Sequence, residues 1–484
     1  MQLKEYQFGF ADAEKEYTRI PGFFDAIFFD PNSIIDKLIQ DYHYLLIGRK
    51  GCGKTAYSCK LKSIAERDKS IYTYSIKLND FEFSNFSKTS IDSDFLGTQK
   101  YKQSWDFMLL LAIYRAIYND LKITENDELN RMVTLLKSLG FSMSFEYKKY
   151  AATLKKFKLG ANIGVINAKF EEEYGNTPSN YLERIGYLID KMLKPLSEFA
   201  LSRKLIILID GADDILRYKK YQLDIISSLI RSIDYLNDLF FGNTNIKIIL
   251  FIREDILSSF TDPDLNKIKR DSSITLSWND ASESLKKLIC LRFQYSGIPE
   301  DQLEGMWYEI FPKLIKDKDS WTYILDYTLN RPRDILQFLK CCQELYPNNL
   351  TLTYSEIKLV LKYYANIYFV EEMKNELAGF IDDSIICALP PVLQHLGTRS
   401  FSYQDFKNAY ADHLGADTLK EPEIKRLLLL LFDSSYIGHL FRHESSCGSM
   451  ETVIFKYRNP TAQIDYKQKF ITHRGVYHGL GTRV

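Results

Sequence analysis

An eight-residue glycine-rich segment has the residue types and spacing to bind phosphate. It reads Gly48-Arg49-Lys50-Gly51-Cys52-Gly53-Lys54-Thr55, a complete G-x-x-x-x-G-K-[ST] pattern. Glycines let backbone N–H groups surround an anion, and a helix N-terminus adds partial positive charge. Lys54 would neutralise the β- and γ-phosphates, and the Thr55 hydroxyl would hold Mg²⁺. We therefore predict ATP and Mg²⁺ as ligands, with these nucleotide-binding residues: Gly48, Arg49, Lys50, Gly51, Cys52, Gly53, Lys54, Thr55 and Ala56.

A cluster of acids follows a second apolar run. Residues 204–209 are mostly aliphatic and end at Asp210, which would lie at the carboxyl edge of a parallel sheet and reach Mg²⁺ through water. Asp213 and Asp214 follow closely, and one of them is placed to orient the attacking water. We favour Asp214 for this catalytic role, while Asp213 could instead serve only an Asx turn.

A third apolar run, residues 246–252, ends in Arg253 instead of an acid. A cation at the carboxyl edge of a strand could touch a γ-phosphate and respond to its loss. The alternative is a structural ion pair with Glu254, Asp255 or Asp214. The two roles do not exclude each other.

Strands and helices alternate around these residues. Strand-like runs occupy residues 42–47, 71–76, 204–210, 246–253 and 274–278, and helical patterns occupy residues 55–68, 104–121, 179–202 and 221–240. Strands that alternate with helices predict an α/β fold with a parallel sheet covered on both faces. We predict a P-loop NTPase core of this kind.

The chain divides into regions of different character. We expect an N-terminal helical extension in residues 1–40, the ATPase core in 41–280 with an insertion at about 79–175, a helical lid in 281–375 and a winged-helix-like domain with a basic tail in 376–484. The lid contains Arg331-Pro332-Arg333-Asp334 at a helix start, because proline suits a first helical turn. Arg333 is predicted to touch nucleotide from the side, and the alternative is a capping ion pair with Asp334.

Three short helices and a strand hairpin are predicted in residues 384–457, which is typical of a winged helix. Its third helix carries Lys425 and Arg426, but the apolar run 427–431 predicts that this helix is mostly buried. The segment after Tyr457 is basic and is expected to be a solvated tail, with phosphate contact as the alternative.

Composition narrows the class of protein. The formal net charge is zero, hydrophobic residues make up 45% and aromatic residues 14%, so the chain can form real cores and is not dominated by nucleic-acid contacts. The seven cysteines show no paired or metal-binding spacing, which predicts free thiols in a reducing cytoplasm. No signal-peptide pattern or membrane-length apolar run is present, so we expect no membrane partner.

The phosphate loop together with the acids at 210–214 resembles the AAA+ and STAND-type P-loop ATPases, and the acidic segment resembles the Walker B motif of NACHT modules. The resemblance implies that Asp210 serves Mg²⁺, that Asp214 prepares the water, that the Arg253 strand is a sensor strand and that Arg331-Pro332-Arg333 is a lid motif. Residues 8–14, the loop start at residues 48–51 and residues 473–475 together resemble a bacterial P-loop ATPase family often found in anti-phage or stress-response loci. The sequence departs from the pattern of these ATPases at two positions. Cys52 stands where a small alanine or serine is usual, which could make the loop oxidisable. Asp214 stands in place of a glutamate, and its shorter reach predicts slow turnover.

Two functions remain from these patterns. The first is an ATP-hydrolysing switch that regulates a protein effector or a homo-oligomeric assembly. The second is a nucleic-acid-associated motor or loader acting through the winged helix, for which only weak DNA contact is expected. A small-molecule kinase is disfavoured because no acceptor motif is evident, and ABC machines and GTPases because their signature motifs are missing. The expected class is thus a cytoplasmic ATPase without sensor repeats.

Overall fold

The computed structural model describes residues 1–78, 83–87, 101–120, 126–141, 143, 154, 164–178, 180–211, 220–260, 262–278, 281–414, 420–445 and 448–481. These residues form two compact units. The sheet unit comprises Asn32–Arg49 and Lys54–Leu276. The helical unit comprises Met1–Pro31, Lys50–Gly53 and Ser277–Val484. Among the residues described, no helix combines the length and apolar character needed to cross a membrane.

A five-stranded parallel sheet forms the centre of the sheet unit. Its order is β2-β3-β4-β1-β5. The strands are β1 (Leu45–Gly48), β2 (Ile71–Lys77), β3 (Lys204–Asp210), β4 (Ile246–Arg253) and β5 (Ser273–Leu276). Every residue of β1 and β4 is buried, as expected for strands covered on both faces. The predicted α/β fold with a parallel sheet is confirmed.

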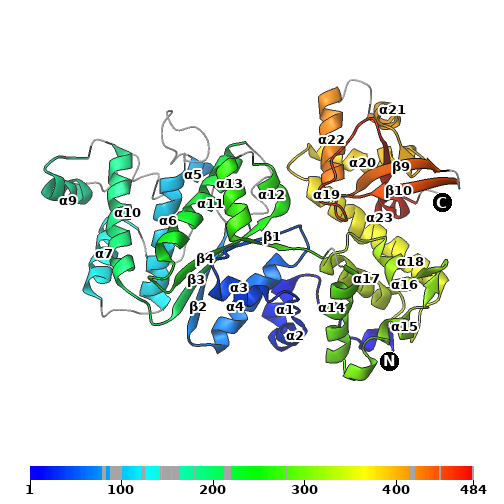
Figure 1. The fold of residues 1–484 in the computed structure, drawn as a ribbon, viewed down its shortest axis with the longest axis horizontal. Helices are drawn as coiled ribbons and strands as arrows, with labels where there is room; N and C mark the ends of the chain where they lie inside the picture. The colour runs from blue at the N-terminus through cyan, green and yellow to red at the C-terminus, as the bar shows by residue number, and fades with distance from the viewer. Residues whose placement is uncertain are drawn as a thin grey trace. The chain divides into compact units, whose positions relative to one another are not determined.

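Helices lie on both sides of this sheet, with α6 and α11 on one side and α3 and α4 on the other (Figure 1). Almost every residue of α6 is buried, because it packs on α10 and α11. The helices of the sheet unit are α3 (Ile34–Gln40), α4 (Lys54–Arg67), α5 (Phe83–Phe86), α6 (Lys102–Arg115), α7 (Asp127–Ser138), α9 (Gly164–Tyr174), α10 (Tyr181–Glu198), α11 (Lys220–Phe240), α12 (Glu254–Ser258) and α13 (Pro263–Ser272), with a π-helical turn at Ala116–Asp120.

The helical unit begins with a short N-terminal segment that packs on α14. Gly9 has a φ of +70°, and a Cβ there would lie 2.2 Å from Glu16 Oε1, so only glycine fits. Glu16 is buried and pairs with Arg292 of α14 at 3.4 Å, while Arg292 Nε also donates to the Phe8 carbonyl. This N-terminal segment is therefore fixed to α14 by the contacts of Glu16 and Phe8 with Arg292.

Helices make up most of the helical unit. They are α1 (Ala13–Arg19), α2 (Pro21–Ile27), α14 (Ala281–Tyr295), α15 (Met306–Ile310), α16 (Ser320–Leu325), α17 (Pro332–Leu345), α18 (Tyr354–Tyr364), α19 (Val370–Leu377), α20 (Asp383–His395), α21 (Tyr403–Leu414), α22 (Glu421–Asp433) and α23 (Arg474–Gly479), with 3₁₀ turns at Leu3–Glu5 and Glu300–Gln302 and a π-helical turn at Ala365–Phe369. A two-stranded hairpin, β6 (Leu314–Ile315) with β7 (Lys318–Asp319), interrupts them.

The C-terminal part contains the predicted helices α20, α21 and α22 and the predicted hairpin, β9 (Ile437–Ser445) with β10 (Gly448–Ile454). Two further short strands, β8 (Ser400–Phe401) and β11 (Lys469–Thr472), complete a four-stranded sheet in the order β10-β9-β11-β8. In α22 the apolar residues Leu427, Leu428 and Leu431 are buried, as expected.

The expectation of a solvated tail after Tyr457 is wrong for Lys469–Gly479, which forms β11 and α23. His473 accepts a hydrogen bond from the Gly475 N–H and so caps α23. A Cβ on Gly475 would lie 2.7 Å from the Phe369 ring and from the Tyr327 carbonyl oxygen, so glycine is required there. Burial lowers the pKa of His473 well below its usual range, helped by neighbouring arginines, so this ring is neutral.

Candidate nucleotide-binding site

The phosphate-binding loop begins where β1 ends and leads directly into α4. Gly51 and Gly53 have φ values of +79° and +104°, which glycine adopts without steric cost. Turns of this kind arrange backbone N–H groups into a concave anion site. The Lys54 ammonium is buried and donates to the carbonyl oxygens of Gly48 at 3.1 Å and Arg49 at 3.4 Å. Its charge is therefore held at the loop.

The carboxyl edge of the sheet gathers the residues predicted on β1, β3 and β4. Gly48 and Arg253 are direct neighbours in the β1–β4 register, and Asp210 ends β3 at the same edge. The Asp210 carboxylate accepts a hydrogen bond from the Gly211 N–H at 2.8 Å. Thr55 is exposed in the first turn of α4. Hydroxyl and carboxylate oxygens are donors that Mg²⁺ prefers, so these residues fit the ion.

Asp213 and Asp214, with Ala212 before them, lie outside the described residues. Their catalytic role stays a prediction. Ala56 is half-buried in the first turn of α4, and its predicted contact with nucleotide also stays a prediction.

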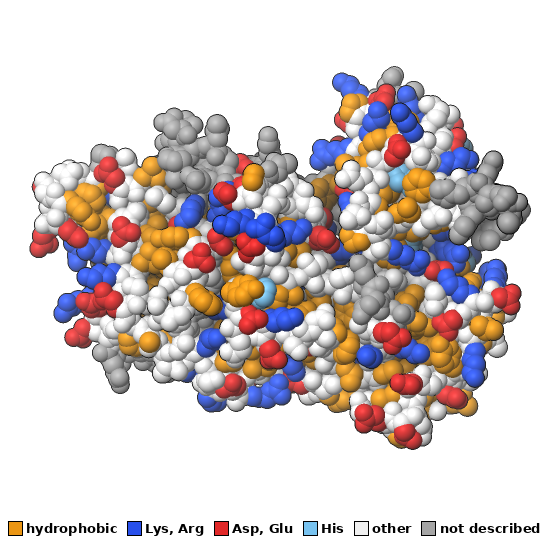
Figure 2. Space-filling view, in the orientation of Figure 1, with side chains coloured by type: hydrophobic (Ala, Val, Ile, Leu, Met, Phe, Trp, Pro, Cys, Tyr) orange, Lys and Arg blue, Asp and Glu red, His pale blue; other side chains and the backbone are white. Residues whose placement is uncertain are grey.

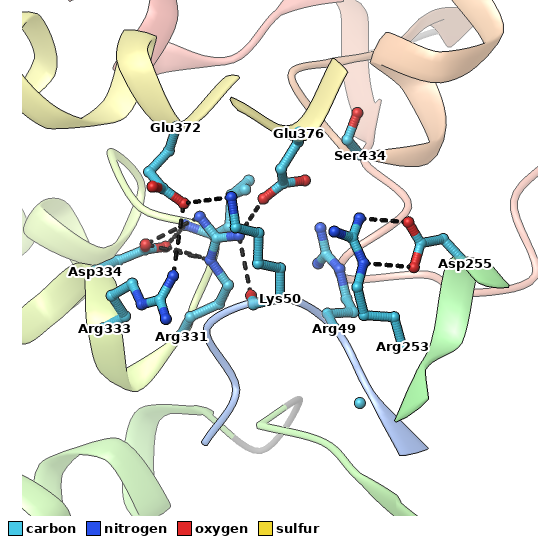
Figure 3. A network of polar contacts seen from close by, with 12 residues as sticks. Arg49, Lys50, Arg253, Asp255, Arg331, Arg333, Asp334, Glu372, Glu376 and Ser434 are labelled. Atoms are coloured by element: carbon cyan, nitrogen blue, oxygen red, sulfur yellow. Dashed lines mark hydrogen bonds and ion pairs between the residues drawn. The ribbon is translucent and has the colours of Figure 1, made fainter. Parts of the chain in front are cut away.

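Arg253 pairs with Asp255, two residues further along the chain. Its Nε donates to Oδ1 of Asp255 at 2.9 Å, and a second guanidinium nitrogen donates to Oδ2 (Figure 3). Partial burial would raise the pKa of the Asp255 carboxyl, but Arg253 and then Lys54 lower it below its usual range. One of the alternatives from the sequence, the ion pair with Asp255, is thus present. A sensor role for Arg253 stays a prediction.

We expect Arg253→Ala to bind ATP within about threefold of the wild-type affinity, because the loop and Lys54 remain. The variant should lose any change in size or assembly that ATP causes relative to ADP. Small-angle scattering and mass photometry with each nucleotide measure this change. Arg270→Ala, which breaks a surface ion pair with Asp271, is the matched control. If Arg253→Ala responds to nucleotide as the control does, Arg253 is only a structural ion pair.

A buried network centred on Arg331 lies against the middle of the loop within the helical unit (Figure 3). Arg331 pairs with Asp334 at 3.0 Å and with Glu376 of α19 at 2.7 Å. It also donates to the Lys50 carbonyl oxygen at 3.1 Å. Burial alone would lower the pKa of the guanidinium, but Asp334 and Glu376 raise it well above its usual range. Arg331 therefore stays charged and fixes the Lys50 backbone.

Glu372 of α19 faces two cations in the same network. Its Oε2 lies 3.4 Å from the Lys50 ammonium and 3.8 Å from the Arg333 guanidinium. This oxygen is buried and receives no hydrogen bond from the described residues. The Arg333 side chain is one-third exposed and its Cβ would lie 3.4 Å from a Cβ on Gly51. Arg333 is thus beside the loop, although its contact with nucleotide stays a prediction.

Three residues around the loop were not predicted. Glu372 and Glu376 are four residues apart and share one face of α19, which was the available signal. Trp278 Nε1 donates to the Cys52 carbonyl oxygen at 2.9 Å, and nothing in the sequence indicated this bond. The Cys52 side chain is buried.

The sheet unit joins a parallel α/β sheet to a glycine-rich loop that has the phosphate-binding pattern. The glycine loop follows β1, the acid ends β3, and β4 lies between these two strands and ends in arginine. The family model for the FunZ-associated C-terminal helical domain matches residues 283–370, which run from α14 to the first residue of α19.

A curated relative is the "Putative transposon gamma-delta 80.3 kDa protein" of Escherichia coli (strain K12). It is 24% identical over 309 residues, which are 62% of this chain and 42% of the relative. The chain therefore spans less than half the length of this relative.

Among solved structures, the chain is similar to Cdc6p from Pyrobaculum aerophilum, with 13% identity, a TM-score of 0.32 and 92% of each chain covered. It is also similar to the ORC2 protein of Aeropyrum pernix in its ADPNP-ADP complexes, with 10% identity, a TM-score of 0.38, and 90% of this chain and 89% of the other covered. A third is Drosophila ORC bound to DNA, with 10% identity, a TM-score of 0.28, and 96% and 86% covered. Structural similarities with identities of 10–13% and TM-scores of 0.28–0.38 assign no activity to the chain.

Proposed function

We propose that this protein is an ATP-binding and slowly ATP-hydrolysing switch that regulates a protein effector or its own assembly. The observation that carries the proposal is the position of Glu372 between Lys50 of the loop and Arg333. Both ion pairs are long and the buried oxygen has no hydrogen bond among the described residues. Triphosphate oxygens are stronger partners for these cations. ATP would therefore compete with Glu372 and break this link between α19 and the loop.

Helix α19 is well placed to pass on this change within the helical unit. It packs on α20 and α23 and follows directly from the π-helical turn at Ala365–Phe369. Phe369 stacks on His473 at 5.1 Å between ring centroids and also contacts Tyr436. A shift of α19 would thus reach the C-terminal sheet, which we take as the surface read by a partner. The bacterial defence role implied by the sequence resemblance remains part of this proposal.

Glu372→Gln should raise ATP affinity about fivefold, which corresponds to about 1 kcal/mol, because a competing charge is removed. The variant should also lose most of the nucleotide-dependent change in shape, since α19 loses the ion pairs from Glu372 to Lys50 and Arg333 and keeps only the link from Glu376 through Arg331. Isothermal titration with ATP and scattering with ATP or ADP measure both effects. The matched control is Glu371→Gln, whose carboxylate is exposed and pairs with Lys374. Wild-type affinity and response in Glu372→Gln would contradict the switch proposal.

A second candidate is a nucleic-acid-associated ATPase, favoured by a cationic cluster in the helical unit. The buried carboxylate of Asp326 binds Lys318 at 2.6 Å, Arg458 at 2.9 Å and Arg474 at 2.8 Å. Burial and then Arg474 lower the pKa of nearby Arg399 to about 10, which indicates a positive local potential. Surplus cations of this kind suit phosphates. The curated relative, whose printed name includes a transposon, also favours this candidate.

Gel shifts of the full chain on random and selected duplexes at rising salt decide between the two candidates. Figure 2 shows positive and negative side chains interspersed on one face, which suits weak binding. Weak, steeply salt-dependent binding that Arg458→Ala reduces keeps the switch first. Nanomolar, sequence-selective binding at physiological salt would put the nucleic-acid function first.

A further inference from the structure

A cavity lies at the amino edge of the parallel sheet, where β3 and β4 begin. Its volume is about 450 Å³, and its walls come from the end of α3, the end of α11, the loop at residues 241–245 and the first residues of β3 and β4. Small-molecule sites typically measure 300–1,000 Å³. Strand β3 separates the cavity from Asp210 by its own length, roughly 20 Å. We call this cavity the strand-start pocket.

Two lysines from neighbouring strands line the strand-start pocket. The Lys204 ammonium donates to the Ile39 carbonyl oxygen at 2.7 Å, and the Lys247 ammonium donates to the Asp41 carbonyl oxygen. Each ammonium has three N–H donors. Within the described ranges neither lysine has a carboxylate at ion-pair distance. Burial, and then the charge of Lys204, lower the pKa of Lys247 to about 7, while Asp41 acts in the opposite direction. The pocket therefore holds positive charge that an anion would stabilise.

Aromatic side chains line the same pocket from the solvent side. Phe241 is 64% exposed and Tyr42 is 57% exposed, so both rings present a face to solvent. Tyr42 stacks on His43 with a centroid distance of 4.4 Å, so its ring is held in place. Figure 2 shows hydrophobic side chains and a histidine at the surface where Figure 1 labels α3. Exposed rings beside cations offer stacking faces for a planar group.

We propose that the strand-start pocket binds a mononucleotide, with its phosphate on Lys204 and Lys247 and its base against Phe241 or Tyr42. The two ammonium groups supply the charge for a dianion, and the rings supply the stacking surface that a bare anion would not use. A carboxylate side chain of a peptide would need the lysines but not the rings. The site is separate from the glycine loop, because the two lie at opposite edges of the sheet.

Titration calorimetry on the full chain carrying Lys54→Ala tests the proposal, because this background weakens phosphate binding at the loop. The probes are AMP, GMP and inorganic phosphate. AMP or GMP should bind, and Lys247→Met or Lys204→Met should weaken AMP and phosphate at least about tenfold, or 1.4 kcal/mol. Phe241→Ala should weaken AMP but not phosphate, which separates the ring contact from the charge contact. Lys62→Met on α4 is the matched control and should change neither.

Methionine keeps the length of the lysine stem, so these variants should fold, and thermal melting checks this directly. The same titrations on the chain with an intact Lys54 keep the test valid if Lys54→Ala folds poorly, because only binding at the strand-start pocket should respond to Lys204→Met or Lys247→Met. Failure to bind AMP and GMP in both preparations would overturn the proposal, as would AMP binding that neither lysine variant weakens. These outcomes are independent of ATP hydrolysis, so they do not bear on the switch.

Affinity should also depend on pH with a defined sign. Below about pH 6 the phosphate monoester gains a proton and loses charge. Above pH 7 the free pocket loses the Lys247 proton, so binding must take it up again, and affinity falls. AMP should therefore bind best between these values, and Lys247→Met should remove the decline above pH 7. The titratable and charged groups near Lys247 and the elements packed around it are Lys204, Asp41, His43, Lys37, Asp234 and Asp238. Asp234 accepts a hydrogen bond from Tyr44, and Asp238 faces Asp234 and Lys267.

Discussion

Lys54→Ala should lower ATP affinity by at least about a hundredfold, or 2.8 kcal/mol, because the β- and γ-phosphate charge is left without its closest cation. In the structure the Lys54 ammonium is buried and lies on the carbonyl oxygens of Gly48 and Arg49. It is thus already in the loop before any phosphate arrives. Titration with ATP and Mg²⁺, followed by phosphate release, measures affinity and turnover.

Lys62→Ala on the same helix is the control for this prediction and should keep wild-type affinity. Asp214→Asn provides a contrast, because it removes a base and leaves the phosphate cradle, so affinity should persist while turnover is lost. If Asp214→Asn hydrolyses ATP as the wild type does, Asp213→Asn is the next variant. Undiminished ATP affinity in Lys54→Ala would contradict the assignment of the loop.

Asp334→Ala should lower the free energy of unfolding of the helical unit by about 3–5 kcal/mol, because it leaves the buried Arg331 charge with one partner fewer. Asp334 is fully buried and accepts hydrogen bonds from Arg331, from the Leu329 N–H at 2.9 Å and from the Tyr368 hydroxyl at 3.0 Å. All of these donors lose their acceptor together. Urea unfolding followed by circular dichroism measures the change.

Asp301→Ala, at an exposed site of the same unit, is the control and should change stability by less than about 0.5 kcal/mol. Asp334→Asn keeps an acceptor oxygen without the charge and should fall between the two. Equal stability of Asp334→Ala and the control would show that Arg331 finds other partners, and the network would then have no structural role.

The central sheet could be predicted because its strands carry their own signal. β3 and β4 are continuous apolar runs, since both faces of each strand are covered, and the residues that end them stand out by their charge. The strands β8 and β11 of the C-terminal sheet gave no such signal. Their two and four residues are too short for a period, and they are strands because β11 pairs with β9 and β8 pairs with β11. The prediction of a solvated tail failed at Lys469–Gly479 for the same reason, because β11 and α23 are too short to show a repeating apolar pattern.

The candidate site divides in the same way. The loop, Asp210 and Arg253 are adjacent to strand ends, so chain order alone places them. The contacts of Lys50 with Glu372 and Arg331 join residues about three hundred positions apart. No local pattern encodes a contact of that kind, and it arises from how the helices pack. The sequence left two roles open for the lid arginines, and the structure separates the buried Arg331 from the partly exposed Arg333.

The Glu16–Arg292 ion pair has a consequence for synthesis on the ribosome. The helical unit is assembled from Met1–Pro31, the short segment Lys50–Gly53 and Ser277–Val484, whereas the sheet unit lies between the first and the last of these. A separation of 276 residues divides Glu16 from Arg292. At about 5–20 residues per second, the N-terminal segment waits roughly 14–55 s for its partner helix. During that interval the apolar residues Phe8, Phe23 and Phe24, which are buried in the folded chain, have no finished core to enter, so this segment offers apolar surface that a chaperone can cover.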